Sequence, residues 1–136
     1  MKRKINKIII HCSATPPNMD VDAETVNEWH LENGWSGIGY HFFIKRDGQI
    51  EIGRPLEKSG AHTKGHNKSS VGICYAGGVD EDMCSEDNRT SEQKSSLLVL
   101  LLLLKNIFPD SVIHGHRDFS DKDCPSFDAT NEYKQL

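Results

Sequence analysis

The sequence has no excess of positive charge. Its 136 residues contain 16 lysines and arginines against 20 aspartates and glutamates, which gives a formal net charge of −4 at pH 7. Proteins that bind nucleic acid need a basic surface to neutralise phosphates, so this balance argues against DNA or RNA as a partner. It also provides no electrostatic reason for the chain to adhere to an anionic membrane.

Long apolar runs are missing as well. The continuously apolar run at residues 97–104 falls far short of the roughly 20 residues that a membrane-spanning helix needs. A basic start at residues 1–4 is followed by an apolar stretch too short for a signal peptide, and no small-residue cleavage site follows it. We therefore expect no membrane insertion, and a chain that is made in the cytoplasm and stays there unless it is released.

There is no C-x-x-C pair either. The four cysteines are widely spaced, which in a cytoplasmic chain disfavours both a disulfide framework and a redox motif. One cysteine with a chemical role and three inert ones is the better interpretation. An apolar fraction of 36% and a charged fraction of 26% are ordinary for a soluble globular protein. A length of 136 residues is sufficient for a single core, so we expect one domain over residues 1–136.

The order of strand-like and helix-like segments predicts the fold class. Three consecutive isoleucines indicate a buried first strand, and Asp47-Gly48 is a strong hairpin turn. Strands are expected at residues 6–11, 39–45, 49–53 and 71–75 and from 112, and helices from Asp20 or Asp22 to Leu31 and from a Thr90–Gln93 capping box to about residue 105. This order predicts an α/β domain with a central mixed β-sheet flanked by helices. The all-round leucine content of the second helix predicts that it is buried against the sheet.

Two predicted strands end on histidines, and a cysteine follows the second of them. His11 ends the first strand, whereas His114 and His116 belong to the last one and precede Cys124. Two imidazoles and one thiolate suit zinc, and three protein ligands leave a fourth position for water, as in catalytic zinc sites. Strand alternation places His114 and His116 on the same face, so both are possible ligands. His116 is favoured because it is nearer the end of the strand. The same alternation turns Cys12 away from His11 into the core. The alternative is that these are ordinary histidines and a buried cysteine.

Several motifs in order resemble one enzyme family over residues 7 to 128. They are Ile-His-Cys-Ser-Ala-Thr at 10–15, Gly-Tyr-His-Phe at 39–42, Ile-Lys-Arg-Asp-Gly at 44–48, Gly-Ala-His-Thr-Lys-Gly-His-Asn at 60–67, Gly-His-Arg-Asp at 115–118 and Lys-Asp-Cys-Pro-Ser-Phe-Asp at 122–128. In these motifs the chain resembles the zinc-dependent N-acetylmuramoyl-L-alanine amidases of type 2. It is most similar to the small phage lysozymes that are amidases by chemistry, and more distantly to the peptidoglycan recognition proteins.

The resemblance assigns roles to residues at matching positions. It makes His11, His116 and Cys124 the ligands of one Zn²⁺ with water in the fourth position, and so selects His116 over its neighbour. It also places Tyr40 and Lys122 where the phage amidases have the residues that assist the zinc in catalysis.

His62 and Asn67 fall in a segment that borders the substrate groove in this family, so we expect them to bind substrate. The fold implied is that of the peptidoglycan recognition proteins and amidases.

The function implied is hydrolysis of the amide bond between N-acetylmuramic acid and L-alanine in peptidoglycan, as in endolysins and prophage lytic enzymes. The alternative is a non-catalytic peptidoglycan-binding module. Members that only bind typically lack the cysteine ligand, and Cys124 is present here together with Tyr40 and Lys122. We expect a monomer that acts on the cell wall after release from the cytoplasm. Some phage amidases in this group also bind a phage RNA polymerase, but no residue pattern in this chain points to that second partner.

Overall fold

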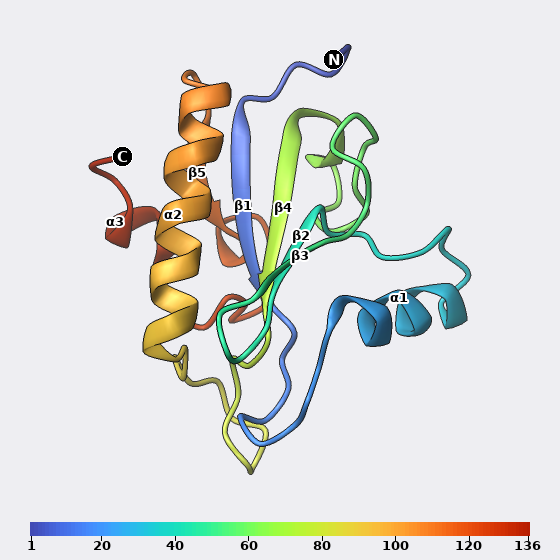
Figure 1. The fold of residues 1–136 in the computed structure, drawn as a ribbon, viewed down its shortest axis with the longest axis vertical. Helices are drawn as coiled ribbons and strands as arrows, with labels where there is room; N and C mark the ends of the chain where they lie inside the picture. Colours follow the sequence, from blue (N-terminus) through green and yellow to red (C-terminus); the bar gives the residue numbers. More distant parts are fainter.

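The computed structural model describes residues 1–136, which form a five-stranded sheet with strand order β3-β2-β4-β1-β5 (Figure 1). Only the hairpin pair β2 and β3 is antiparallel, and the other neighbouring strands run parallel. The predicted mixed sheet is therefore confirmed. The strands are β1 (Lys7–Cys12), β2 (Phe42–Ile44), β3 (Ile50–Ile52), β4 (Ser70–Tyr75) and β5 (Val112–Gly115).

The two longer helices begin where the sequence places their capping residues. Of the two candidates for the first helix, Asp22 is the cap: its carboxylate accepts a hydrogen bond from a first-turn backbone N–H at 2.8 Å, and α1 spans Ala23–Glu32. Thr90 and Gln93 form the predicted capping box at the start of α2, which spans Ser91–Ile107. These caps satisfy backbone N–H groups that the first helical turn leaves without partners.

The two helices lie on opposite faces of the sheet (Figure 1). Side chains alternate along β1, so Ile8, Ile10 and Cys12 pack against α2 in the larger core cluster. The predicted burial of Cys12 in the core is thus confirmed. On the other face, Val26 of α1 packs in a smaller cluster with residues of β2 and β4. His11 must face this second side, away from α2.

The predicted burial of α2 against the sheet is confirmed, but it is limited to one side of the helix. One stripe of the helix packs on the sheet and is almost fully buried, but nothing in the chain covers the opposite stripe, because α2 forms the outer layer. Five large apolar side chains there are between 42% and 62% exposed: Leu98, Val99, Leu102, Leu103 and Ile107. No helix of the structure combines the length and the apolar character required to cross a membrane.

Adjacent leucines on α2 should therefore respond very differently to truncation. Leu101 is completely buried, whereas Leu102 is half exposed. Leu101→Ala is expected to lower the free energy of unfolding by about 2–5 kcal/mol, because it removes core contacts and leaves a cavity. The matched Leu102→Ala variant should change it by no more than about 0.5 kcal/mol. Urea unfolding of both variants measures the difference, and equal losses would contradict the burial pattern.

A short helix near the C-terminus was not predicted. α3 spans only Ala129–Glu132 and starts after Asp128, whose side chain accepts a hydrogen bond from Asn131 N at 3.1 Å. Four residues are too few to give a helical hydrophobic period. Ala129 packs into the larger core cluster, so tertiary contacts hold this turn next to β5.

Candidate metal centre and groove

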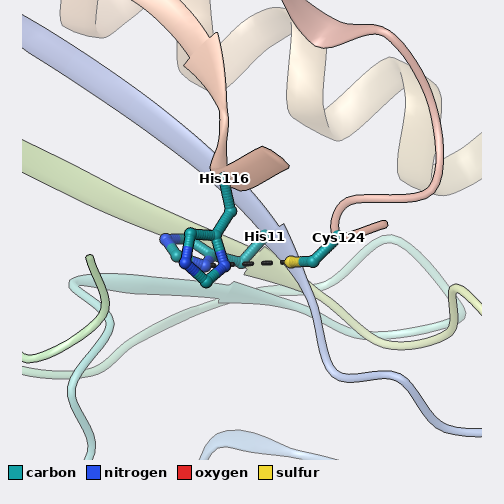
Figure 2. A group of neighbouring side chains, drawn as sticks. All are labelled: His11, His116 and Cys124. Atoms are coloured by element: carbon teal, nitrogen blue, oxygen red, sulfur yellow. Dashed lines mark hydrogen bonds between the residues drawn. The ribbon is translucent and has the colours of Figure 1, made fainter. Parts of the chain in front are cut away.

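The side chains of His11, His116 and Cys124 converge at one edge of the sheet (Figure 2). Each offers one ligand atom, and these three atoms all lie within 4.8 Å of one another. β1 and β5 are parallel neighbours, so the segments that follow their carboxyl ends meet at the same edge. With metal–ligand bonds of about 2.0–2.3 Å, one ion between these atoms could reach all three.

The structure brings His116 to this cluster and leaves His114 outside it. β5 ends at Gly115, and His116 begins a 3₁₀ turn over His116–Asp118. The alternation argument that placed both histidines on one strand face is therefore wrong, because His116 is no longer part of the strand. His114 instead has its Nδ1 3.4 Å from Asp118 Oδ2.

The loop that carries Cys124 is anchored to the sheet at the thiol and at the next residue. The Cys12 backbone N–H donates to Cys124 Sγ at 3.3 Å, and the Tyr75 hydroxyl donates to the Pro125 carbonyl oxygen at 2.6 Å. A Cβ atom at Gly115 would lie 2.8 Å from Pro125 Cδ, so the glycine allows the loop to pack against the end of β5. The thiol is held in place by contacts that are distant in sequence.

The two histidine ligands are favoured in their neutral form. Burial, together with the neighbouring His62 and His116, holds the pKa of His11 well below its usual value. Burial and the ammonium of Lys122 lower the pKa of His116. A neutral imidazole has a free lone pair for a metal, and two imidazoles with one cysteine sulfur form a donor set typical of zinc. The residues present therefore fit a metal ion.

Tyr40 and Lys122 both lie beside the cluster. The ring centroid of Tyr40 is 5.0 Å from that of His11, and burial raises the pKa of the phenol well above its usual value, so its hydroxyl keeps its proton at neutral pH. The exposed Lys122 lines a cavity of about 420 Å³ that opens beside His116. The other lining residues are Trp35, Ala61, His62, Thr63, Lys64 and Asn67.

His62 and Asn67 line this groove, but their polar atoms mainly contact the protein. Asn67 Oδ1 accepts hydrogen bonds from the backbone N–H groups of His62 and Thr63, both at 2.9 Å. Nδ1 of His62 lies 2.9 Å from Nε2 of His11, and burial lowers the pKa of His62 to about 3.

Sequence reasoning missed two residues of this site. Thr63 Oγ1 lies 3.2 Å from His11 Nε2, and Trp35, 43% exposed, forms part of the groove wall. Neither belongs to a ligand pattern, and a single threonine or tryptophan gives no signal of its own. Only the structure reveals them, because it places Thr63 against His11 and Trp35 in the lining of the groove.

The fold and the site define an α/β protein with a candidate metal centre that opens into a polar groove. Comparison with known proteins identifies the family. The chain belongs to the N-acetylmuramoyl-L-alanine amidase family, whose model matches residues 1–127. It is thus a hydrolase that cleaves the amide bond between N-acetylmuramic acid and L-alanine in peptidoglycan, as the sequence motifs predicted.

Individual relatives agree with this assignment. The endolysin of Enterobacteria phage K11 is 44% identical over 127 residues, which cover 93% of this chain and 84% of that protein. Among solved structures, the amidase LysC from Clostridium intestinale superposes with a TM-score of 0.82 at 33% identity, covering 96% of this chain and 82% of that one. Drosophila PGRP-LB has a TM-score of 0.78 at 27% identity over 100% of this chain and 83% of its own. The predicted fold of amidases and peptidoglycan recognition proteins is confirmed.

Proposed function

We propose that the chain is an endolysin-type amidase that works with one Zn²⁺ held by His11, His116 and Cys124. The observation that carries this proposal is the convergence of two neutral imidazoles and one thiol within 4.8 Å, beside an open cavity. Three protein donors leave one coordination position free for water or substrate, which distinguishes catalytic from structural zinc.

The zinc ion, Lys122 and Tyr40 would each contribute differently to the reaction. Bound zinc would act as a Lewis acid on the scissile carbonyl and bring the pKa of its water close to 7. When the carbonyl is attacked, negative charge develops on its oxygen, and the ammonium of Lys122 stabilises that charge from the cavity wall. The protonated hydroxyl of Tyr40 donates a hydrogen bond to the carbonyl or the water and relays a proton.

The groove accommodates the substrate on either side of the scissile bond. Its lining includes His62 and Asn67, which we propose as substrate-binding positions together with the exposed ring of Trp35. An exposed tryptophan presents a large apolar face beside polar groups, which suits a ligand that combines a sugar ring with a peptide. Peptidoglycan is the only partner in this proposal, and RNA polymerase binding is not part of it.

The same residues favour catalysis over recognition alone. A module that only binds peptidoglycan needs the groove but not a complete donor set. Here Cys124 completes the donor set, Tyr40 lies against His11, and Lys122 lines the cavity beside His116. Because the K11 relative is an endolysin, we infer that this protein also acts on the cell wall after release from the cytoplasm.

Metal removal tests the proposed function directly. The purified protein is expected to contain one zinc per chain and to release stem peptide with a new L-alanine amino group from a purified muropeptide. Removal of the metal with a chelator should abolish release, and stoichiometric Zn²⁺ should restore it, because the ion supplies the Lewis acid. A zinc-loaded protein that binds the muropeptide without releasing peptide would instead be a recognition module.

A further inference from the structure

His62 lies directly behind the metal ligand His11. Sγ of Cys124 is 3.9 Å from Nδ1 of His11, so this nitrogen faces the other metal donors. The opposite ring nitrogen, Nε2, faces His62 Nδ1 at 2.9 Å. The two rings meet edge to face, with an interplanar angle of 86° and centroids 4.8 Å apart. His62 thus contacts the ring nitrogen that an ion bound at Nδ1 would leave free.

The protons in this contact can be assigned from the geometry. A metal on Nδ1 requires His11 to carry its proton on Nε2, so that Nε2 must donate a hydrogen bond. Nδ1 of His62 lies within range at 2.9 Å and Oγ1 of Thr63 at 3.2 Å. His62 Nδ1 accepts only when the His62 proton is on Nε2, and that nitrogen lies 3.4 Å from Oγ of the buried Ser70. Thr63 Oγ1 also lies 2.9 Å from His62 Nδ1, and its hydroxyl can donate to that nitrogen. Two N–H groups cannot face each other at 2.9 Å, so a proton on His11 Nε2 leaves His62 Nδ1 as an acceptor.

Two glycines fix the position of the His62 ring. A Cβ atom at Gly72 would lie 2.5 Å from its Cδ2 atom, and a Cβ atom at Gly60 would lie 2.6 Å from the same atom. The backbone N–H of His62 is bound to Asn67 Oδ1 at 2.9 Å. The ring is thus enclosed by backbone on two sides and cannot turn freely toward the groove.

We propose that His62 is a positioning residue that orients His11 and fixes its tautomer for metal binding, beyond its place in the groove wall. The inference rests on the proposed metal centre, because without an ion the orientation of His11 would have no consequence for the site. Hydrogen-bond partners of this kind raise the basicity of a histidine ligand and reduce its freedom to rotate. Their loss typically costs about 10- to 100-fold in metal affinity or activity.

Two substitutions at His62 distinguish hydrogen bonding to His11 from a purely packing role. In His62→Asn, Oδ1 stands in the place of Nδ1 and can still accept from His11 Nε2, although the side chain is smaller. His62→Leu is nearer to histidine in size but has no acceptor. The zinc affinity of each metal-free variant, measured by competition with a chromophoric chelator and without substrate, is expected to fall about 10- to 100-fold in His62→Leu. His62→Asn should recover most of that loss.

A spectroscopic readout accompanies the affinity measurement. The visible absorption of Co²⁺ bound in place of zinc reports ligand geometry, and we expect it to change in His62→Leu and to resemble the wild type in His62→Asn. Thermal unfolding of the metal-free variants serves as the control for folding.

Wild-type zinc affinity and an unchanged cobalt spectrum in folded His62→Leu would overturn the proposal, and so would a loss confined to the KM for muropeptide. Failure of the proposed function is distinguishable, since the wild type itself would then bind no zinc or cleave no amide.

Discussion

Cys124→Ser is expected to abolish turnover and to weaken zinc binding. The loss of zinc affinity should exceed the roughly 10- to 100-fold that is typical of substitutions outside the ligand set. The Cys124 sulfur belongs to the cluster whose ligand atoms lie within 4.8 Å of one another, and it can bind as a thiolate. A serine hydroxyl is neutral at pH 7 and a poor zinc ligand. Loss of this donor leaves two imidazoles, which hold the ion weakly and in an undefined geometry. Zinc content after dialysis and amide cleavage by the same sample measure both effects.

The chain provides a matched control for the loss of a thiol. Cys84 is exposed and lies outside the donor cluster, so Cys84→Ser should keep both zinc and activity. If Cys124→Ser retained zinc with the affinity of the wild type, the sulfur would not be a ligand, and the assignment of the centre would fail.

Lys122→Ala should lower kcat by about 10²- to 10³-fold, the usual cost of removing one group that stabilises an oxyanion. The ammonium lies in the groove wall beside His116, whose pKa it lowers, but Lys122 belongs to none of the donor positions. Zinc content should therefore stay at one ion per chain. Steady-state cleavage of a purified muropeptide, with kcat and KM determined separately, shows whether the loss occurs in the transition state or in substrate binding.

A lysine far from the groove controls for the change in net charge. Lys94 is an exposed residue of α2, the helix on the face of the sheet opposite His11, so Lys94→Ala should leave kcat unchanged. Full activity of Lys122→Ala would remove this lysine from the mechanism without affecting the metal assignment.

Short-range sequence signals predicted a helix or strand well where a few neighbouring residues are sufficient to define it. The Thr90 and Gln93 side chains can reach backbone N–H groups within the same helical turn, so the sequence alone locates the start of α2. Which side of α2 is covered could not be predicted from such local signals. Composition shows that leucines surround the helix, but only the position of the sheet decides which stripe is covered, and the stripe with Leu102 is not.

Which donors are available follows from the sequence alone: imidazoles and a thiol of the kinds zinc prefers, within motifs that identify an amidase family. The sequence could not select His116 over His114 by periodicity, because that depends on where β5 ends and the 3₁₀ turn begins. Only the tertiary structure brings together His11 and Cys124, which are 113 residues apart in the chain, and places His62 behind the first of them. Ligand chemistry is a property of single side chains, whereas coordination depends on distances that parallel strand pairing and loop packing impose.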